Sequence, residues 1–125
     1  MLQFSPQART TVEGFCESLE LPAFPARDGS YSFVFQRSGM LTITPARDGR
    51  SIVSLARRPE RADGPMLKRF FLAAGIDPTT NLALHAGLSK DGSLIYSVDF
   101  AVDDFTVPAL HACLRNLIAA HDALG

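Results

Sequence analysis

The sequence predicts an α+β protein in which an antiparallel sheet packs against helices, in the order α-β-β-β-α-β-β-α. Three observations support this fold class. Near both ends of the chain, apolar residues recur at helical spacing just after a capping hydroxyl and a proline. Five short runs between them carry the alternation of half-buried strands. Strands grouped in antiparallel runs, with helices outside the runs, indicate an α+β sandwich and not a doubly wound sheet.

Length and composition fit a single domain over residues 1–125. The chain is 46% hydrophobic and 20% charged, which suffices to bury one core without disulfides or metal. A formal net charge of −1 points neither to nucleic acid nor to a membrane surface as partner. The N-terminus lacks the pattern of a signal peptide, and the longest apolar run, "FFLAAGI", is too short to span a bilayer. We therefore expect a cytoplasmic protein.

Charge is unevenly distributed along the chain. Residues 47–69 carry seven basic side chains and three acidic ones. From residue 91 onward the chain has five aspartates and a single arginine. The basic block could bind phosphate, but no aromatic residues are interleaved with it as on a nucleic-acid surface. We interpret both regions as solvated surfaces, with a charged partner or partner subunit as the alternative.

The first half of the chain predicts one helix and three strands. Ser5 and Pro6 begin the helix, and Pro22 follows its end. A loop of three residues, "RSG", would pair the first two strands with Phe35 opposite Leu41. The three strands are expected at residues 31–36, 40–44 and 51–57.

The second half predicts two helices around a hairpin. Asp63 is the expected cap of a short helix over residues 65–74. Its apolar positions occupy more than one stripe of so short a helix: Met66, Leu67, Phe70, Phe71 and Ala74. Thr106 and Pro108 begin the last helix, which has a continuous apolar stripe.

The stretch "NLALHAGLSKDGSLIYSVDF", residues 81–100, predicts the hairpin between them. A three-residue loop, "KDG", is favoured because Gly92 can take the left-handed conformation that closes it. This register places the apolar residues on one face, whereas a two-residue loop would set Leu84 opposite Asp99. The other face is small and only half polar: Ala83, His85, Gly87, Ile95, Ser97 and Asp99.

His85, Ser97 and Asp99 lie close enough on that face to suggest a serine hydrolase. A serine nucleophile, however, needs an exposed oxygen, usually on a strained turn, with amide donors aimed at an oxyanion. Ser97 lies in mid-strand, where neighbouring amides are committed to the sheet. We therefore favour a structural polar cluster and expect no catalytic residue, with the hydrolase as the alternative from the enzyme class.

No cofactor or metal site is expected. "GLSKDGS" resembles a phosphate loop but lacks the lysine before its last serine, and a strand follows where a helix is required. His85, His111 and His121 do not have metal-ligand spacing. Cys16 and Cys113 form no Cys-x-x-Cys pair and fall on apolar helix faces, so we expect core residues in a reducing cytosol.

Surplus apolar surface remains after one core is filled. The short helix, the small-residue face of the last hairpin and the reverse face of the first three strands exceed what a monomer of this size covers easily. Oligomerisation together with a peptide-binding surface would cover all three.

The chain resembles the class I type III secretion chaperones, small cytoplasmic proteins related to the Tir chaperone. The resemblance covers essentially the whole chain and rests mainly on the order of elements. Particular stretches carry it: a first helix ending in "LELP", the short helix "MLKRFFLAAG", the hairpin "LALHAGLSKDGSLIYSVDF" and the closing helix "DDFTVPALHACLRNLIAAHDAL".

The resemblance implies a non-enzymatic homodimer without cofactors that binds the N-terminal segment of a secreted effector and keeps it non-globular for export. The dimer interface implied by the family, carried onto this chain, involves Leu67, Phe70, Phe71, Ala83, His85 and Gly87. Effector contacts would lie on Val34, Met40, Thr42 and Ile52, with the outer side of the first helix near Val12. The unusually basic block allows a heterodimer instead, and a regulator of similar fold that binds a cytoplasmic partner is the alternative function.

Overall fold

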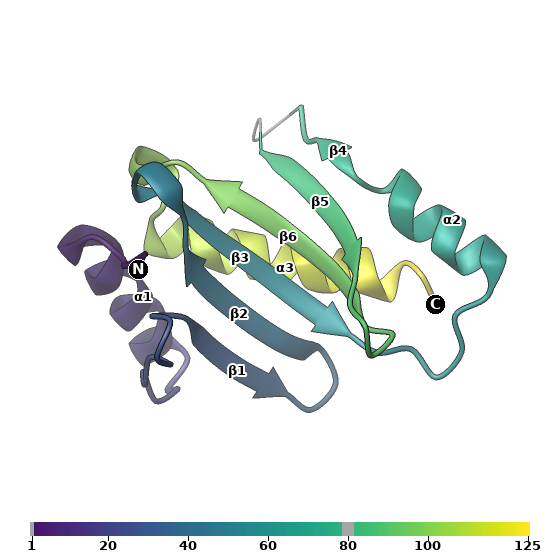
Figure 1. Cartoon of the computed structure of the whole chain (residues 1–125), viewed down its shortest axis with the longest axis horizontal. Coiled ribbons are helices and arrows are strands. Elements are labelled where there is room, and N and C mark those ends of the chain that lie inside the picture. The colour runs from purple at the N-terminus through teal and green to yellow at the C-terminus, as the bar shows by residue number, and fades with distance from the viewer. Residues whose placement is uncertain (1, 79–81) are drawn as a thin grey trace.

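The computed structural model describes residues 2–78 and 82–125 (Figure 1). Its elements are α1 (Pro6–Ser18), β1 (Tyr31–Phe35), β2 (Gly39–Pro45), β3 (Ser51–Arg57), α2 (Gly64–Leu72), β4 (Gly75–Ile76), β5 (Ala83–Leu88), β6 (Leu94–Phe100) and α3 (Val107–Asp122). This succession confirms the predicted fold class and adds one very short strand, β4, that the sequence did not reveal.

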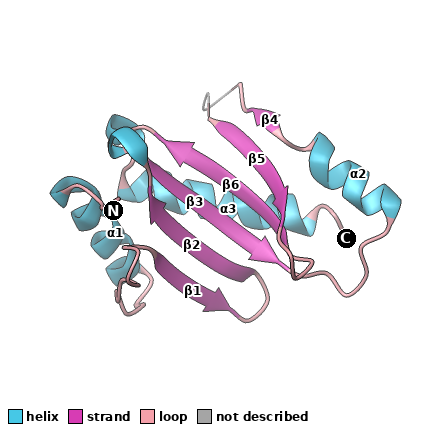
Figure 2. Cartoon of the chain, in the orientation of Figure 1, coloured by secondary structure: helices cyan, strands magenta, loops and turns pink. Residues whose placement is uncertain are grey.

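All strands belong to one antiparallel sheet in the order β1-β2-β3-β6-β5-β4. Helices α1 and α3 contact each other, and α3 also contacts β3 and β6, so these helices cover one face of the sheet (Figure 1). Helix α2 lies beside the β4–β5 edge (Figure 2). Within the described residues no helix covers the other face, which we call the open face.

Helices α1, α2 and α3 each begin at the predicted cap, because a side-chain oxygen accepts an otherwise unpaired backbone N–H. The Ser5 hydroxyl accepts from the Ala8 amide at 3.1 Å in α1. In α2 the Asp63 carboxylate accepts from the Met66 amide at 2.8 Å. In α3 the Thr106 hydroxyl accepts from the backbone amide of Ala109, the third residue after it. Such caps stabilise a helix by about 1 kcal/mol each.

The core lies between the sheet and its two covering helices. β6 shows the alternation most clearly, since Leu94, Tyr96, Val98 and Phe100 are all buried while the residues between them are partly exposed. Fully burying a large apolar side chain stabilises the fold by about 1.5–3 kcal/mol. Phe15 of α1 is also fully buried, so the first helix is part of this core.

The last hairpin has the predicted register. Leu84 pairs with Val98, and the Ser89 amide donates to the Ser93 carbonyl at 3.0 Å across the three-residue loop. Gly92 has a φ of 89°, as that loop requires. Asn81, where the predicted hairpin begins, lies outside the described residues.

The predicted register of the first hairpin is wrong by two residues. Phe35 pairs with Gly39, and Phe33, not Phe35, lies opposite Leu41. The reason is a contact that the local sequence does not encode. Gly39 belongs to β2 with a φ of 110°, and a Cβ there would lie 2.1 Å from the Ala56 carbonyl oxygen of β3. A shift of two leaves every side chain on its predicted face.

Candidate functional site

The open face is built from rows of residues that run across the strands. Since neighbouring strands are in register, each row takes one residue from each strand it crosses. An apolar row consists of Val34, Met40, Ala56, Ile95 and Gly87. A polar row beside it consists of Ser32, Thr42, Ser54, Ser97 and His85.

The apolar row is exposed where it begins at the β1 edge. Val34 is 81% exposed and Met40 is 43% exposed, although both lie in regular strands. At the other end a Cβ on Gly87 would have no atom within 4 Å, so the row ends in a flat, open position. An apolar stripe that is exposed at Val34 and Met40 and partly exposed on the next three strands is the kind of surface that a partner covers.

In the polar row, hydroxyl groups interact with other residues of the same row. The Ser32 and Thr42 hydroxyls lie 3.3 Å apart, and the Ser54 hydroxyl donates to the Thr42 carbonyl at 3.5 Å. Short hydroxyl side chains keep this part of the face low, so an approaching backbone or helix can come close to the sheet. Ile52 and Thr42, two of the predicted effector contacts, both lie half-buried on the open face.

The geometry does not assemble a hydrolase site. Ser97 is opposite His85, as predicted, but no hydrogen bond joins them among the described residues. The Asp99 carboxylate instead accepts from Nε of Arg50 at 2.8 Å, in a half-exposed ion pair. His85 therefore lacks the orienting carboxylate that a triad needs. The described residues also hold no cluster of three potential metal ligands.

The residues predicted for the dimer interface lie on two different faces. Phe71 is 47% exposed on α2, whereas Phe70 is fully buried with its ring 4.6 Å from that of Tyr96, on the helix-covered side of the sheet. Ala83, His85 and Gly87 have the opposite orientation on β5 and belong to the open face. Phe70 is thus a core residue in this structure, and its prediction as a dimer-interface residue is wrong.

Two exposed apolar residues near Phe71 were missed from the sequence. Leu72 is 72% exposed and Ile76 is 68% exposed. With Phe71 they give three exposed apolar residues within positions 71–76, at the end of α2 and in β4, a segment that we call the α2–β4 edge. Leu67 is half-buried on the same helix. The apolar crowding of the short helix pointed to this edge, but the sequence did not show which residues turn outward.

Val12 is wrong as an effector contact. Its side chain is fully buried and belongs to the core, because α1 packs against α3 with this face inward. The rings of Phe15 and His111 lie 5.0 Å apart at the same junction, and His111 Nε2 is 2.8 Å from the Ser18 hydroxyl. No surface of Val12 is left for a partner.

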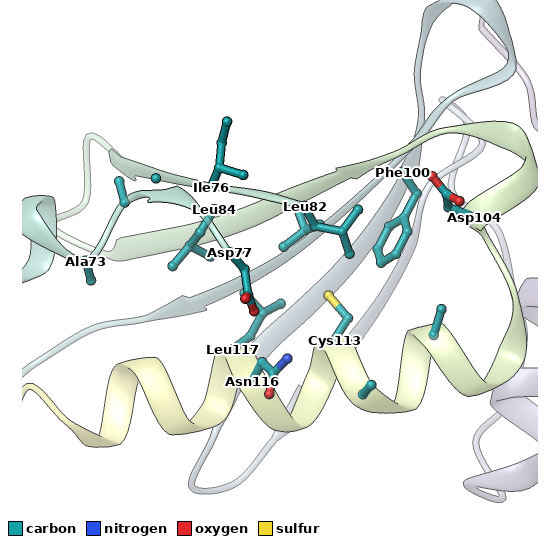
Figure 3. Close-up of a pocket in the computed structure, with 15 residues that line it drawn as sticks. Ala73, Ile76, Asp77, Leu82, Leu84, Phe100, Asp104, Cys113, Asn116 and Leu117 are labelled. Carbon is teal, nitrogen blue, oxygen red and sulfur yellow. The ribbon is translucent and has the colours of Figure 1, made fainter. Parts of the chain in front are cut away.

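A groove of about 550 Å³ lies between α3 and the part of the sheet that no helix covers on that side. Figure 3 shows Cys113 and Leu117 of α3 on one wall, with Leu82, Leu84 and Phe100 opposite. Its walls come from segments far apart in the sequence, so no local pattern predicts it. Burial raises the pKa of the Cys113 thiol to about 12, which makes it an unreactive lining group.

His121 is buried, and the two cysteines are core residues, as predicted. The His121 Nε2 lies 2.8 Å from the Leu55 carbonyl oxygen, so Nε2 carries the proton. Burial lowers the pKa of this imidazole below its usual value, which keeps it neutral. Cys16 and Cys113 are both buried and free.

Together these features define a small α+β protein-binding module, with an open sheet face, an apolar edge and no assembled catalytic group among the described residues. The described residues contain no helix long and apolar enough to cross a membrane.

Comparison with known protein families identifies the class of this protein-binding module. The chain belongs to the family of the type III secretory system chaperone SycN, whose model matches residues 8–124. Among curated proteins no relative matches the chain.

Solved structures with the same fold include a type III secretion chaperone and a chaperone–effector complex. One is the Yersinia pestis type III secretion chaperone SycH in complex with a stable fragment of YscM2, with a TM-score of 0.74, 13% identity, and 94% of this chain and 99% of that chain covered. The ExsC–ExsE complex gives a TM-score of 0.69 at 15% identity, covering 94% and 90%. The HopA1–SchA chaperone–effector complex gives 0.63 at 20% identity, with the same coverage.

Proposed function

We propose that this chaperone binds a non-globular segment of a secreted effector on the open face of its sheet. The observation that carries the proposal is the exposed apolar row, from Val34 and Met40 to Ile95. Family membership supports the chaperone role, and the HopA1–SchA chaperone–effector complex supports the kind of partner. Burial of client side chains would offset the ordering of the client segment without ATP.

The spacing of the row suits a short amphipathic client helix lying across the strands. Neighbouring strands are about 4.8 Å apart, and a helix rises about 5.4 Å per turn. Apolar side chains one turn apart on the client would therefore meet Val34, Met40 and Ile95 nearly in step. The low polar row leaves room for the helix backbone beside them. A client strand added at the free edge of β1 is compatible with the same surface.

We propose further that two copies, or this chain and a related subunit, associate through the α2–β4 edge. Phe71, Leu72 and Ile76 there are too exposed for a monomer that also shows an apolar open face. Leu67 extends this edge along α2. The other predicted interface residues, Ala83, His85 and Gly87, lie on the neighbouring strand β5, and we propose that they also belong to the interface. We also propose that the chain is related to the Tir chaperone, in addition to its membership of the SycN family. The same proposal has the protein act in the cytoplasm without catalysis.

Replacement of Phe71 tests the interface. Phe71→Asp would place an unpaired charge in a buried contact, which is strongly unfavourable. We expect light scattering to give the mass of one chain for this variant and of two chains for the wild type. A matched control is Lys68→Asp, an exposed change one turn earlier on α2. A soluble Phe71→Asp dimer of unchanged mass would contradict the proposed interface.

A tagged pull-down from native cytosol, read by mass spectrometry, tests the function itself. We expect one secreted protein to be retained by the wild type and lost from a Val34→Asp variant. Because Val34 is almost fully exposed, this change leaves folding intact. Retention of the same protein by both forms would show that the client does not bind on the open face.

A further inference from the structure

A second pocket lies on the opposite side of the sheet from the open face, where the end of β3, the start of α2 and the end of α3 meet. It encloses about 380 Å³, at the low end of the roughly 300–1,000 Å³ typical of ligand pockets. Apolar side chains from three elements line it: Met66, Leu94 and Leu124. Arg57, Arg61, Glu60 and His121 also line it, so the pocket combines an apolar lining with two guanidinium groups and one carboxylate.

Arg57 is held in place at this pocket. Its Nε donates to the Ser38 carbonyl at 3.1 Å, and its Nη1 forms an ion pair with Asp122 at 2.7 Å. Only 24% of the Arg57 side chain is exposed. A guanidinium fixed in this way loses little conformational freedom when it binds a further carboxylate.

Positive charge continues from the pocket along the surface. Arg61 is exposed and makes no ion pair within the described part of the chain. Residues 57–69 carry five basic side chains against Glu60 and Asp63, an excess of three. Glu60, which is already included in this sum, lies in the wall, and Asp122 pairs with Arg57, so an excess of two positive charges remains.

We propose that this pocket binds an acidic linear segment of a partner protein, with one apolar side chain of the segment inside and its carboxylates on the arginines. Charge complementarity selects an acidic partner, and the apolar lining selects a peptide over a bare anion. A nucleic acid fits less well, because no Phe, Tyr or Trp side chain lines the pocket for base stacking. The site goes beyond effector binding on the open face, and both sites can be occupied at once.

Binding of a defined synthetic peptide tests the proposal without any knowledge of the partner. The probe is a fluorescein-labelled ten-residue peptide of aspartate and glutamate around one central leucine, and the readout is fluorescence anisotropy with the full chain at low salt. A second peptide replaces the leucine by serine. An oligodeoxythymidine of equal charge serves as competitor.

Two charge reversals provide the matched comparison. Arg61→Glu changes the pocket, and Arg27→Glu makes the same change at an exposed position in the loop before β1. Loss of a charge-assisted hydrogen bond predicts about tenfold weaker peptide binding for Arg61→Glu and an effect below about twofold for Arg27→Glu. The serine peptide should bind about fivefold to tenfold more weakly than the leucine peptide.

Four results would overturn the inference. They are absence of binding by the wild type at low salt, equal effects of the two reversals, equal affinity of the two peptides, and full competition by the oligodeoxythymidine. Because both arginines are exposed, unchanged circular dichroism and melting should accompany either variant. The outcome is separate from effector binding, since the pull-down with Val34→Asp reports on the other face.

Discussion

Replacing Tyr96 by phenylalanine should loosen α2 from the sheet. The buried Tyr96 hydroxyl donates to the Phe70 carbonyl at 2.9 Å. Phe70 is in the last turn of α2, where carbonyl groups have no partner within the helix. The hydroxyl therefore satisfies a carbonyl that the helix itself cannot, and it joins two elements that are 26 residues apart in the sequence.

The magnitude follows from the burial of both groups. A buried carbonyl left without a donor costs about 1–3 kcal/mol, because it loses its partner but does not regain water. With a urea dependence of about 2 kcal/mol per molar, a loss of about 2 kcal/mol lowers the unfolding midpoint by about 1 M. The midpoint should be compared at one protein concentration, since association also stabilises the folded state.

Tyr31→Phe is the matched control. Tyr31 is also buried, but its hydroxyl has no hydrogen-bond partner among the described residues and is not enclosed. Removing it should change the unfolding free energy by less than about 0.5 kcal/mol. Equal midpoints for Tyr96→Phe and Tyr31→Phe would show that this hydrogen bond does not anchor α2.

Three further outcomes follow from the structure. Gly39→Ala should destabilise the fold by several kcal/mol because its Cβ meets the neighbouring backbone, whereas Gly64→Ala, with open space around it, should be nearly neutral in the same urea titration. Because burial lowers the folded-state pKa of His121, the unfolded chain binds the proton more readily, so stability should fall as pH drops below about 6.5, and His121→Gln should weaken that dependence; an unchanged pH profile would contradict it. Cys113 should resist iodoacetamide at pH 8 in the folded protein and react on unfolding; rapid labelling of the folded chain would show that the thiol is not held in its buried, protonated form.

Local sequence signals predicted the parts of the fold that local chemistry controls. The three helix starts were predicted because each depends on one capping side chain and a nearby proline. The last hairpin was predicted because its register is fixed by alternation and by Gly92 at the turn. The open face was predicted as two surplus surfaces, and the pairing of β3 with β6 joins them into one.

Features that depend on distant contacts were missed or wrong. The register of the first hairpin depends on the approach of Gly39 to Ala56 on the next strand. The inward orientation of Phe70 and the outward one of Phe71 depend on where α2 meets Tyr96. Both grooves have walls from three or more segments, which no run of neighbouring residues reveals.

The buried cysteines permit one direct test of effector binding on the open face. In a Val34→Cys variant the new thiol would be the only accessible one among the described residues, because Cys16 and Cys113 are both buried. An environment-sensitive fluorophore can therefore be attached at position 34. A Gln7→Cys variant, labelled on the exposed side of α1, is the control. The measurement is the emission of each label when the secreted protein recovered by the pull-down is added. Effector binding on the open face predicts a blue shift for the label at position 34 and none at position 7; a response at position 7 alone would show that the effector binds elsewhere.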